Sequence, residues 1–264
     1  MRIGVFDSGL GGLTVVQAMT KVIKGAEVFY VADTKHAPYG EKTPEQIMQY
    51  SLDITRYLLD TYQIDALILA CNTATSAAIR HLREIYPSLI IIGTEPGIKP
   101  AIEQTKTGKI GVLATPATLQ GDKYKQLTQA LASQKSVEIY EQACHGLVQQ
   151  IEKGEIESVE TVNLLEKWLR PMRENNVDTI VLGCTHYPLV SKSIEKIMNC
   201  NVNLIHTGEA ISRYLLASLM NQKGHINEGK LHIHIFVTGR IQRQVVDTII
   251  ETYDDFQTIQ IGND

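Results

Sequence analysis

The chain has 264 residues, which is too long for one small core and suits two modest domains. Hydrophobic residues make up 44% and charged residues 20%, which excludes a disordered, collagen-like or coiled-coil chain. With 25 Lys and Arg against 29 Asp and Glu, the net charge is −4, which argues against nucleic acid or an anionic membrane as a partner. No apolar run reaches the roughly 18 residues of a membrane span. The N-terminus lacks a signal-peptide pattern, so we expect a cytoplasmic protein.

Short apolar runs alternate with amphipathic segments along the chain. Most of the runs are continuously apolar, which predicts strands covered on both faces, as in parallel sheets. A capping box at Thr43-Pro44-Glu45-Gln46 predicts a helix that continues to Tyr62. The pattern indicates an α/β protein with doubly wound, mainly parallel sheets. The strands are predicted over 2–6, 28–32, 66–70, 90–93, 109–114, 137–142, 179–183, 202–205 and 231–238, and two further helices over 164–170 and 211–220.

Two pairs of segments indicate an internal repeat. Residues 64–73 align with 177–186 at an offset of 113, and an aspartate and a cysteine coincide in the two segments. Residues 2–6 align with 109–113 at an offset of 107. Buried strands can look alike by composition alone, which is the alternative explanation. The similar offsets favour one duplicated α/β unit with small insertions.

A duplicated unit predicts two domains related by pseudo-twofold symmetry. We expect one domain to comprise 1–97 plus 208–264 and to carry Cys71. The second domain is expected over 98–207 and carries Cys184. No linker rich in Pro, Gly or Ser separates them, so we expect the active site in a cleft between two closely packed domains.

The two repeated cysteines have the sequence setting of reactive thiols. Cys71 and Cys184 each follow the last apolar residue of a predicted strand and precede a predicted helix start. Ligands bind at the carboxyl ends of strands in open parallel sheets. A helix N-terminus stabilises a thiolate and also binds a carboxylate. Further donors follow the two cysteines at Asn72, Thr73 and Thr185.

Two equivalent thiols on opposite sides of a small ligand suit inversion at a carbon atom. One thiolate removes a proton from one face, and the other thiol returns a proton to the opposite face. A hydrolase needs one nucleophile and one base, so two nearly identical sites are harder to explain for it. The remaining cysteines, Cys144 and Cys200, lack this setting and are interpreted as small buried thiols in a reducing compartment.

Four motifs occur in order along the chain, at 4–12, at 32–33 with 38–40, at 70–74 and at 183–188. Together they resemble those of glutamate racemases, which belong to the cofactor-independent aspartate/glutamate racemase family. These enzymes have two α/β domains, act through two cysteines and supply D-glutamate for peptidoglycan. The resemblance implies glutamate as the substrate, with neither a cofactor nor a metal. We also expect a homodimer.

The resemblance also implies roles for individual residues. Cys71 corresponds to the base for D-glutamate and Cys184 to the base for L-glutamate. Asp7 resembles the acid that supports Cys71, while Glu152 and His186 resemble the groups beside Cys184. The implied substrate-binding pairs are Asp7-Ser8, Tyr39-Gly40, Asn72-Thr73 and Thr185-His186.

Other interpretations of the same residues stay open at this stage. Asp7 could cap the first helix. Cys184 with His186 could be the nucleophile and base of a thiol hydrolase, which leaves Cys71 unexplained, or could ligate a metal. An aspartate racemase of the same family is the nearest alternative, and a non-enzymatic amino-acid-binding protein is another. Racemisation through pyridoxal phosphate would need a Schiff-base lysine and a phosphate site, and no clear candidate is present.

Overall fold

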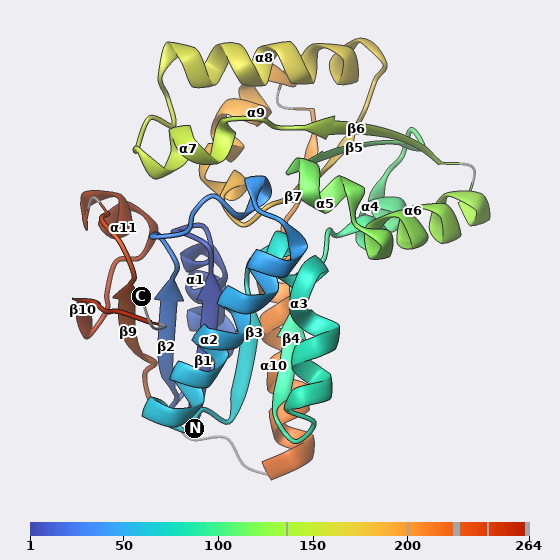
Figure 1. Cartoon of the computed structure of the whole chain (residues 1–264). Coiled ribbons are helices and arrows are strands. Elements are labelled where there is room, and N and C mark those ends of the chain that lie inside the picture. The colour runs from blue at the N-terminus through green and yellow to red at the C-terminus, as the bar shows by residue number, and fades with distance from the viewer. Residues whose placement is uncertain (136, 200, 224–227, 242, 262–264) are drawn as a thin grey trace. The chain divides into compact units, whose positions relative to one another are not determined.

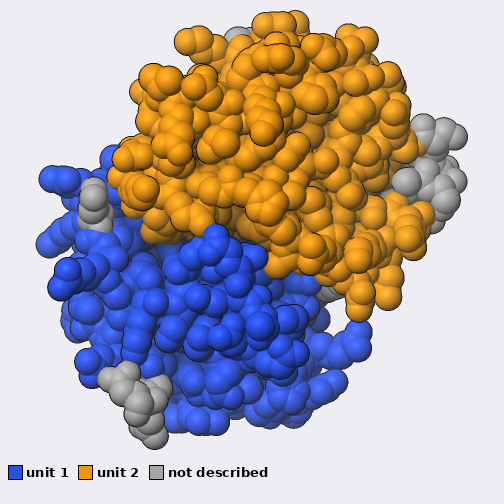
Figure 2. All heavy atoms as spheres, turned by 45° about the horizontal axis from the view of Figure 1, so that its top comes forward, with its two compact units in different colours: residues 1–94, 208–264 blue, residues 95–207 orange. Residues whose placement is uncertain are grey.

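The structure is a computed structural model that describes residues 1–135, 137–199, 201–223, 228–241 and 243–261. Cys200 lies outside the described residues. The chain divides into two compact units, coloured separately in Figure 2. Unit 1 comprises 1–94 and 208–264, and unit 2 comprises 95–207. The division falls three residues before the boundary that we expected after residue 97.

Unit 1 is built on a six-stranded sheet in the order β10-β9-β2-β1-β3-β4, with every neighbouring pair parallel. The central strand β1 is buried from Ile3 to its last residue, Asp7. The strands are β1 (Arg2–Asp7), β2 (Glu27–Ala32), β3 (Ala66–Leu69), β4 (Ile90–Gly93), β9 (His232–Val237) and β10 (Asp255–Thr258).

Helices cover both faces of this sheet (Figure 1). Helix α1 packs against α10 and α11, and α2 packs against α3. This two-sided cover explains the continuous apolar runs of the strands, because each central strand must bury both rows of side chains. The helices are α1 (Leu13–Val22), η1 (Tyr39–Glu41), α2 (Pro44–Tyr62), α3 (Asn72–Ile85), α10 (Gly208–Lys223) and α11 (Arg243–Ile249).

Unit 2 is built on a four-stranded parallel sheet in the order β6-β5-β7-β8. Its strands are β5 (Lys109–Ala114), β6 (Glu138–Ala143), β7 (Thr179–Gly183) and β8 (Asn203–Ile205). Its helices are α4 (Ile98–Gln104), α5 (Pro116–Gln120), α6 (Asp122–Lys135), α7 (Leu147–Glu152), α8 (Val159–Glu174), η2 (Tyr187–Val190) and α9 (Ser191–Ile197).

The pairing registers repeat between the two sheets. In unit 1 Gly4 of β1 lies opposite Leu67 of β3, and in unit 2 Gly111 of β5 lies opposite Ile180 of β7. These positions are related by the same offsets, 107 and 113, that the sequence repeat has. The order β2-β1-β3-β4 in unit 1 also matches β6-β5-β7-β8 in unit 2. The α/β class with parallel sheets in two domains is therefore confirmed.

The nine predicted strands and helix α2 lie within two residues of their predicted bounds. Helix α10, at Gly208–Lys223, extends three residues beyond the predicted 211–220 at each end, and β10 and α8 also differ. Strand β10 was not predicted, because its four residues are only half-buried or exposed and form no apolar run. Helix α8 is longer than the predicted 164–170 at both ends. It continues through Pro171, at which the sequence pattern suggested a stop.

The capping box predicted at the start of α2 is present. Thr43 Oγ1 accepts the Gln46 N–H at 3.3 Å, and Gln46 Oε1 accepts the Thr43 N–H at 3.1 Å. Two backbone donors that the helix cannot pair internally are thereby satisfied. Helix α2 then buries Ile47, Ile54 and Leu58 in the core beneath it.

We expect Thr43→Ala to lower the free energy of unfolding of the protein by about 1 kcal/mol, because it removes the side-chain acceptor of the cap. Thr43→Ser is the matched control, since it keeps the hydroxyl and should retain most of the stability. Urea denaturation followed by circular dichroism measures the difference. Equal losses in the two variants would show that the hydroxyl is not the stabilising group.

Candidate active site

Cys71 lies at the carboxyl edge of the unit 1 sheet, as the N-cap residue of α3. Its sulfur accepts the Ala74 N–H at 3.4 Å and lies 3.6 Å from Ser8 Oγ. The side chain is 6% exposed. Hydrogen bonds from a helix N-terminus favour the charged form of a thiol, so this setting stabilises a thiolate. The predicted position of Cys71 between a strand and a helix start is confirmed.

Asp7 is the last residue of β1, and it is fully buried. Its carboxylate accepts the Gly9 N–H at 3.0 Å. The N-cap residue of α1 is Gly12, with no side-chain cap, so the interpretation of Asp7 as the cap of the first helix is wrong. A Cβ on Gly12 would lie 2.6 Å from Asp7 Cβ and 2.9 Å from the Tyr30 ring. Glycine at position 12 therefore lets the loop close tightly over Asp7.

Tyr39 lies in η1, and Gly40 follows it. The Tyr39 hydroxyl donates to Asp33 Oδ2 at 2.6 Å, and the Thr238 hydroxyl donates to Asp33 Oδ1 at 2.7 Å. Burial raises the pKa of Tyr39 well above its ordinary value, and Asp33, Cys71 and Asp7 act in the same direction. Tyr39 is therefore held as a neutral phenol near the Cys71 thiol. Sequence reasoning quoted Asp33 only as part of a motif and missed this anchoring contact.

The remaining predicted residues of unit 1 are close in sequence to these groups. Ser8 follows Asp7 and faces the Cys71 sulfur, as described above. Asn72 and Thr73 form the first turn of α3 and are buried. The Asn72 side-chain amide donates to the Thr94 carbonyl at 3.4 Å. The structure thus places the predicted unit 1 site residues at or just after the carboxyl end of a strand, in the first turn of α3, or in η1.

Cys184 directly follows β7 in unit 2 and has a different setting. Its sulfur lies 3.7 Å from His186 Nδ1. His186 Nε2 lies 2.5 Å from Glu152 Oε1, at the end of α7. His186 is 2% exposed, and the side chain of Glu152 is 20% exposed. The structure therefore brings Cys184, His186 and Glu152 into one chain of contacts, although Glu152 is 34 residues from His186 in sequence.

The electrostatics of His186 follow from these contacts. Burial acts to lower its pKa, but the interactions with Cys184 and Glu152 outweigh burial and raise the pKa well above the ordinary value. A protonated imidazole beside Cys184 stabilises the thiolate through its charge. No α-helix begins directly after Cys184, because the next helix is η2, which starts at Tyr187. The expectation of a helix start at both cysteines is thus only partly met.

Glu152 reaches His186 because of how α7 begins. Gly146, the N-cap residue of α7, has a φ of +80°, in the left-handed region that other residues rarely adopt. The helix buries Leu147 and Ile151 in the unit 2 core and ends at Glu152. A short, anchored helix therefore holds this carboxylate at the imidazole.

Cys144 does not share the features of the other two thiols. It is buried in the unit 2 core, where its Sγ donates to the Gln142 carbonyl at 3.6 Å. Burial raises its pKa, which keeps it a neutral thiol. This is the small buried thiol that the sequence indicated.

Thr115 and Thr118 were missed by sequence reasoning. Thr115 follows β5, whose last residue pairs with Gly183, so Thr115 and Cys184 leave neighbouring strands at the same edge. The hydroxyl oxygens of Thr115 and Thr118 are 3.0 Å apart, and both residues are buried. Thr185, which the sequence did single out, is also buried at this edge. A threonine N-cap at a strand end is the signal that could have identified the pair.

The described residues bear on two further kinds of site, a metal centre and a membrane span. Across the ranges given above, no three or more His, Cys, Asp and Glu side chains gather as metal ligands would. Among the helices described there, none is both long and apolar enough to cross a membrane.

Known proteins resemble this chain along nearly its whole length. The family model of Asp/Glu/hydantoin racemases matches residues 3–215. A glutamate racemase of Sulfurovum sp. is 66% identical over 99% of this chain and 98% of its own length. A glutamate racemase isoform from Bacillus anthracis has a TM-score of 0.83 at 29% identity, covering 98% of this chain and 97% of that chain. A glutamate racemase from Francisella tularensis, solved in complex with D-glutamate, has the same TM-score and coverage at 28% identity.

The family match covers most of the chain, and the similar proteins carry both units. Their likeness thus extends over the sheet edges at which the two cysteines, Asp7 and His186 lie. The chain belongs to the Asp/Glu/hydantoin racemase family and is an isomerase of the racemase class.

Proposed function

We propose that this protein is a glutamate racemase that interconverts L- and D-glutamate. The observation that carries the proposal is the 66% identity, over 99% of the chain, to a protein named glutamate racemase. The Francisella tularensis protein in complex with D-glutamate supports the same substrate. Aspartate racemase remains the nearest alternative, and the Picrophilus torridus aspartate racemase, at 16% identity, shares the fold alone.

The proposed mechanism uses Cys71 and Cys184 as a pair of acid and base. From L-glutamate, the Cys184 thiolate removes the Cα proton and becomes a thiol. The Cys71 thiol then gives its proton to the opposite face of the same carbon and becomes a thiolate. The reverse direction exchanges the two roles, so every proton is accounted for. This mechanism requires both thiols to reach the Cα atom of one glutamate from opposite faces.

The surroundings of each thiol support these roles in different ways. At Cys71, the hydrogen bond from Ala74 N–H supports the thiolate, and Asp7 lies at the end of the neighbouring strand β1. At Cys184, the His186–Glu152 pair supplies a positive charge next to the sulfur. The implied binding pairs Asp7-Ser8, Tyr39-Gly40, Asn72-Thr73 and Thr185-His186 are proposed to hold the substrate's carboxylates and amine.

The biological role proposed here is the supply of D-glutamate for peptidoglycan. A homodimer in the cytoplasm is the proposed form of the enzyme. These proposals rest on the resemblance to glutamate racemases and on the composition of the chain.

With purified protein and no added pyridoxal phosphate, metal or nucleotide, we expect L-glutamate to become a mixture of both enantiomers. Two thiols supply both proton-transfer groups, so no cofactor is needed for the chemistry proposed. Chiral chromatography with L-aspartate in parallel measures the outcome. Faster turnover of aspartate would favour the alternative substrate, and activity lost with EDTA and restored by zinc would contradict the mechanism.

Cys71→Ala and Cys184→Ala should each lower kcat for racemisation by at least about 10²–10⁴-fold, because inversion needs an acid and a base on opposite faces. Cys144→Ala is the matched control and should retain activity. In deuterated water, early D-glutamate formed from L-glutamate should carry deuterium at Cα, while the remaining L-glutamate stays largely protiated.

Two outcomes would contradict the two-thiol mechanism. Early product that keeps its original proton would indicate a single base. The Cys184–His186–Glu152 arrangement by itself also suits a thiol hydrolase. That enzyme would lose activity with Cys184→Ala and keep it with Cys71→Ala.

Glu152→Gln should lower the pKa of His186, because the neutral amide removes the charge that opposes the effect of burial. His186 has a raised pKa in the folded protein, so its stabilising effect is complete below about pH 6.5, the pKa of a free histidine. The effect is lost as the pH rises through the folded-state value. The stability difference between wild type and Glu152→Gln should therefore be largest at weakly acidic pH, near and somewhat below about 6.5, where His186 is charged and the carboxylate of Glu152 is still ionised.

Imidazole NMR signals measured across pH provide the direct test of that shift. His206 is an internal control, because burial lowers its pKa and it should lose its proton before His186 does. An unchanged His186 titration in Glu152→Gln would remove Glu152 from the proposed support of Cys184.

A further inference from the structure

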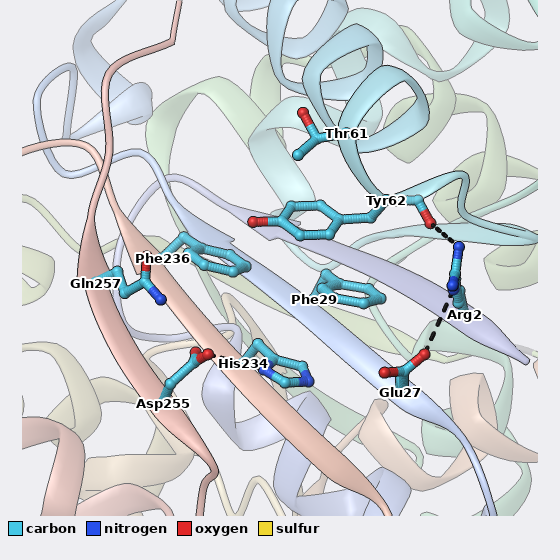
Figure 3. A pocket seen from close by; sticks show the side chains of 9 residues that line it. All are labelled: Arg2, Glu27, Phe29, Thr61, Tyr62, His234, Phe236, Asp255 and Gln257. Carbon is cyan, nitrogen blue, oxygen red and sulfur yellow. Dashed lines mark hydrogen bonds and ion pairs between the residues drawn. The ribbon is translucent and has the colours of Figure 1, made fainter.

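A pocket in unit 1 is lined by residues of β1, β2, β9 and β10 and by the end of α2 (Figure 3). It has a volume of about 340 Å³. Arg2 and Glu27, which line it, are the first residues of β1 and β2, whereas Cys71 follows the carboxyl end of β3. The pocket therefore begins at the opposite end of the sheet from Cys71, and its lining extends along β9 to Phe236.

Flat rings form one side of this pocket, which we call the aromatic pocket. Tyr62 stacks on Phe29 with ring centres 4.2 Å apart, and on Phe236 at 5.2 Å. The His234 ring is nearly parallel to Phe29 at 5.1 Å. Figure 3 shows the four rings clustered together, with His234 next to Asp255. Such a cluster offers π-electron density to a flat or cationic group.

Carboxylates lie on two sides of the four rings. Glu27 lies 3.4 Å from the Arg2 guanidinium, which also donates to the Tyr62 carbonyl at 3.2 Å. On the other side, Asp255 Oδ2 accepts a hydrogen bond from His234 Nδ1 at 3.0 Å. Two carboxylates thus line the pocket with one guanidinium, and a positively charged ligand can pair with Asp255.

One carboxylate oxygen of Asp255 makes no hydrogen bond within the described part of the chain. Its Oδ1 and the Nε2 of His234 are buried, and neither has a partner in the part of the chain that the structure describes. A buried acceptor without a donor carries a desolvation cost. The Asp255 side chain as a whole is 37% exposed, and the terminal torsion of an aspartate turns easily. A small rotation would present Oδ1 to an N–H donor in the pocket.

We propose that the aromatic pocket binds a planar cation with N–H donors, of the amidinium or guanidinium type. The flat group would lie against the four aromatic rings, and its N–H groups would donate to the carboxylate of Asp255. Both contacts favour the same ligand, because cation–π attraction and charge-assisted hydrogen bonds each require a positive group. The site is independent of the racemase chemistry proposed above.

Benzamidine is the probe, because it joins an aromatic ring to an amidinium group. Benzamide, its neutral analogue of nearly equal size, is the matched control ligand. We expect the Kd of benzamidine to be at least about tenfold lower than that of benzamide, measured by calorimetry on the full-length wild type. In amide NMR spectra, the shifted signals should include Tyr62, His234 and Asp255. A saturating concentration of D-glutamate should not displace benzamidine.

Asp255→Asn should raise the Kd of benzamidine about tenfold, since it removes the charge of the acceptor. Glu160→Gln, an exposed charge loss on α8 in unit 2, is the matched control and should leave the Kd unchanged. The melting temperature and the racemase activity of both variants check their folding. If Asp255→Asn does not fold, the wild-type comparison of the two ligands and the NMR map still decide. Equal affinity for the two ligands, or shifts confined to other residues, would overturn the proposal.

Discussion

Parallel pairing of each central strand with its neighbour is the constraint on which the candidate site depends. Parallel strands end at a common edge, so the residues that follow them lie close together however far apart they are in sequence. In unit 1 the pairing of β1 with β3 brings the loop after Asp7 next to Cys71. In unit 2 the pairing of β5 with β7 does the same for Thr115 and Cys184.

The two thiols occupy corresponding positions in a repeated topology but are supported by different chemistry. Cys71 relies on the backbone of a long helix, whose N–H groups are fixed and do not titrate. Cys184 relies on an imidazole whose charge depends on a carboxylate. The strand ends are thus alike in the two units, whereas the segments that follow them differ. A fixed helix dipole does not change with pH, whereas a titratable charge does. The electrostatic settings of Cys71 and Cys184 therefore respond differently to pH.

The sequence was most informative where the local pattern and the fold agree. Continuous apolar runs identified the strands, and the duplicated Asp and Cys identified both thiols and the repeat. The 3.7 Å contact of Cys184 with His186 is also local, since only Thr185 separates them in the sequence. The capping box of α2 was predicted because its four residues interact only with one another.

Contacts between distant segments were harder to predict. The resemblance, and not any local pattern, indicated Glu152, because α7 reaches His186 only through tertiary packing. Asp33 was missed as an anchor since two of its partners, Tyr39 and Thr238, come from separate segments. Strand β10 has too few apolar residues to signal a strand, and it forms by pairing with β9.

The discontinuity of unit 1 has a consequence for synthesis of the chain. Strand β2 pairs with β9, and Glu27 lies opposite His232, so this part of the sheet joins segments some two hundred residues apart. Unit 2 is continuous over 95–207 and can complete its sheet while the ribosome still holds the last 57 residues of unit 1. Until these emerge, the outer edge of β2 lacks its neighbour, and an open strand edge is prone to wrong pairing. The nascent chain therefore keeps this open edge until β9 emerges, after the segments bearing both cysteines have been made.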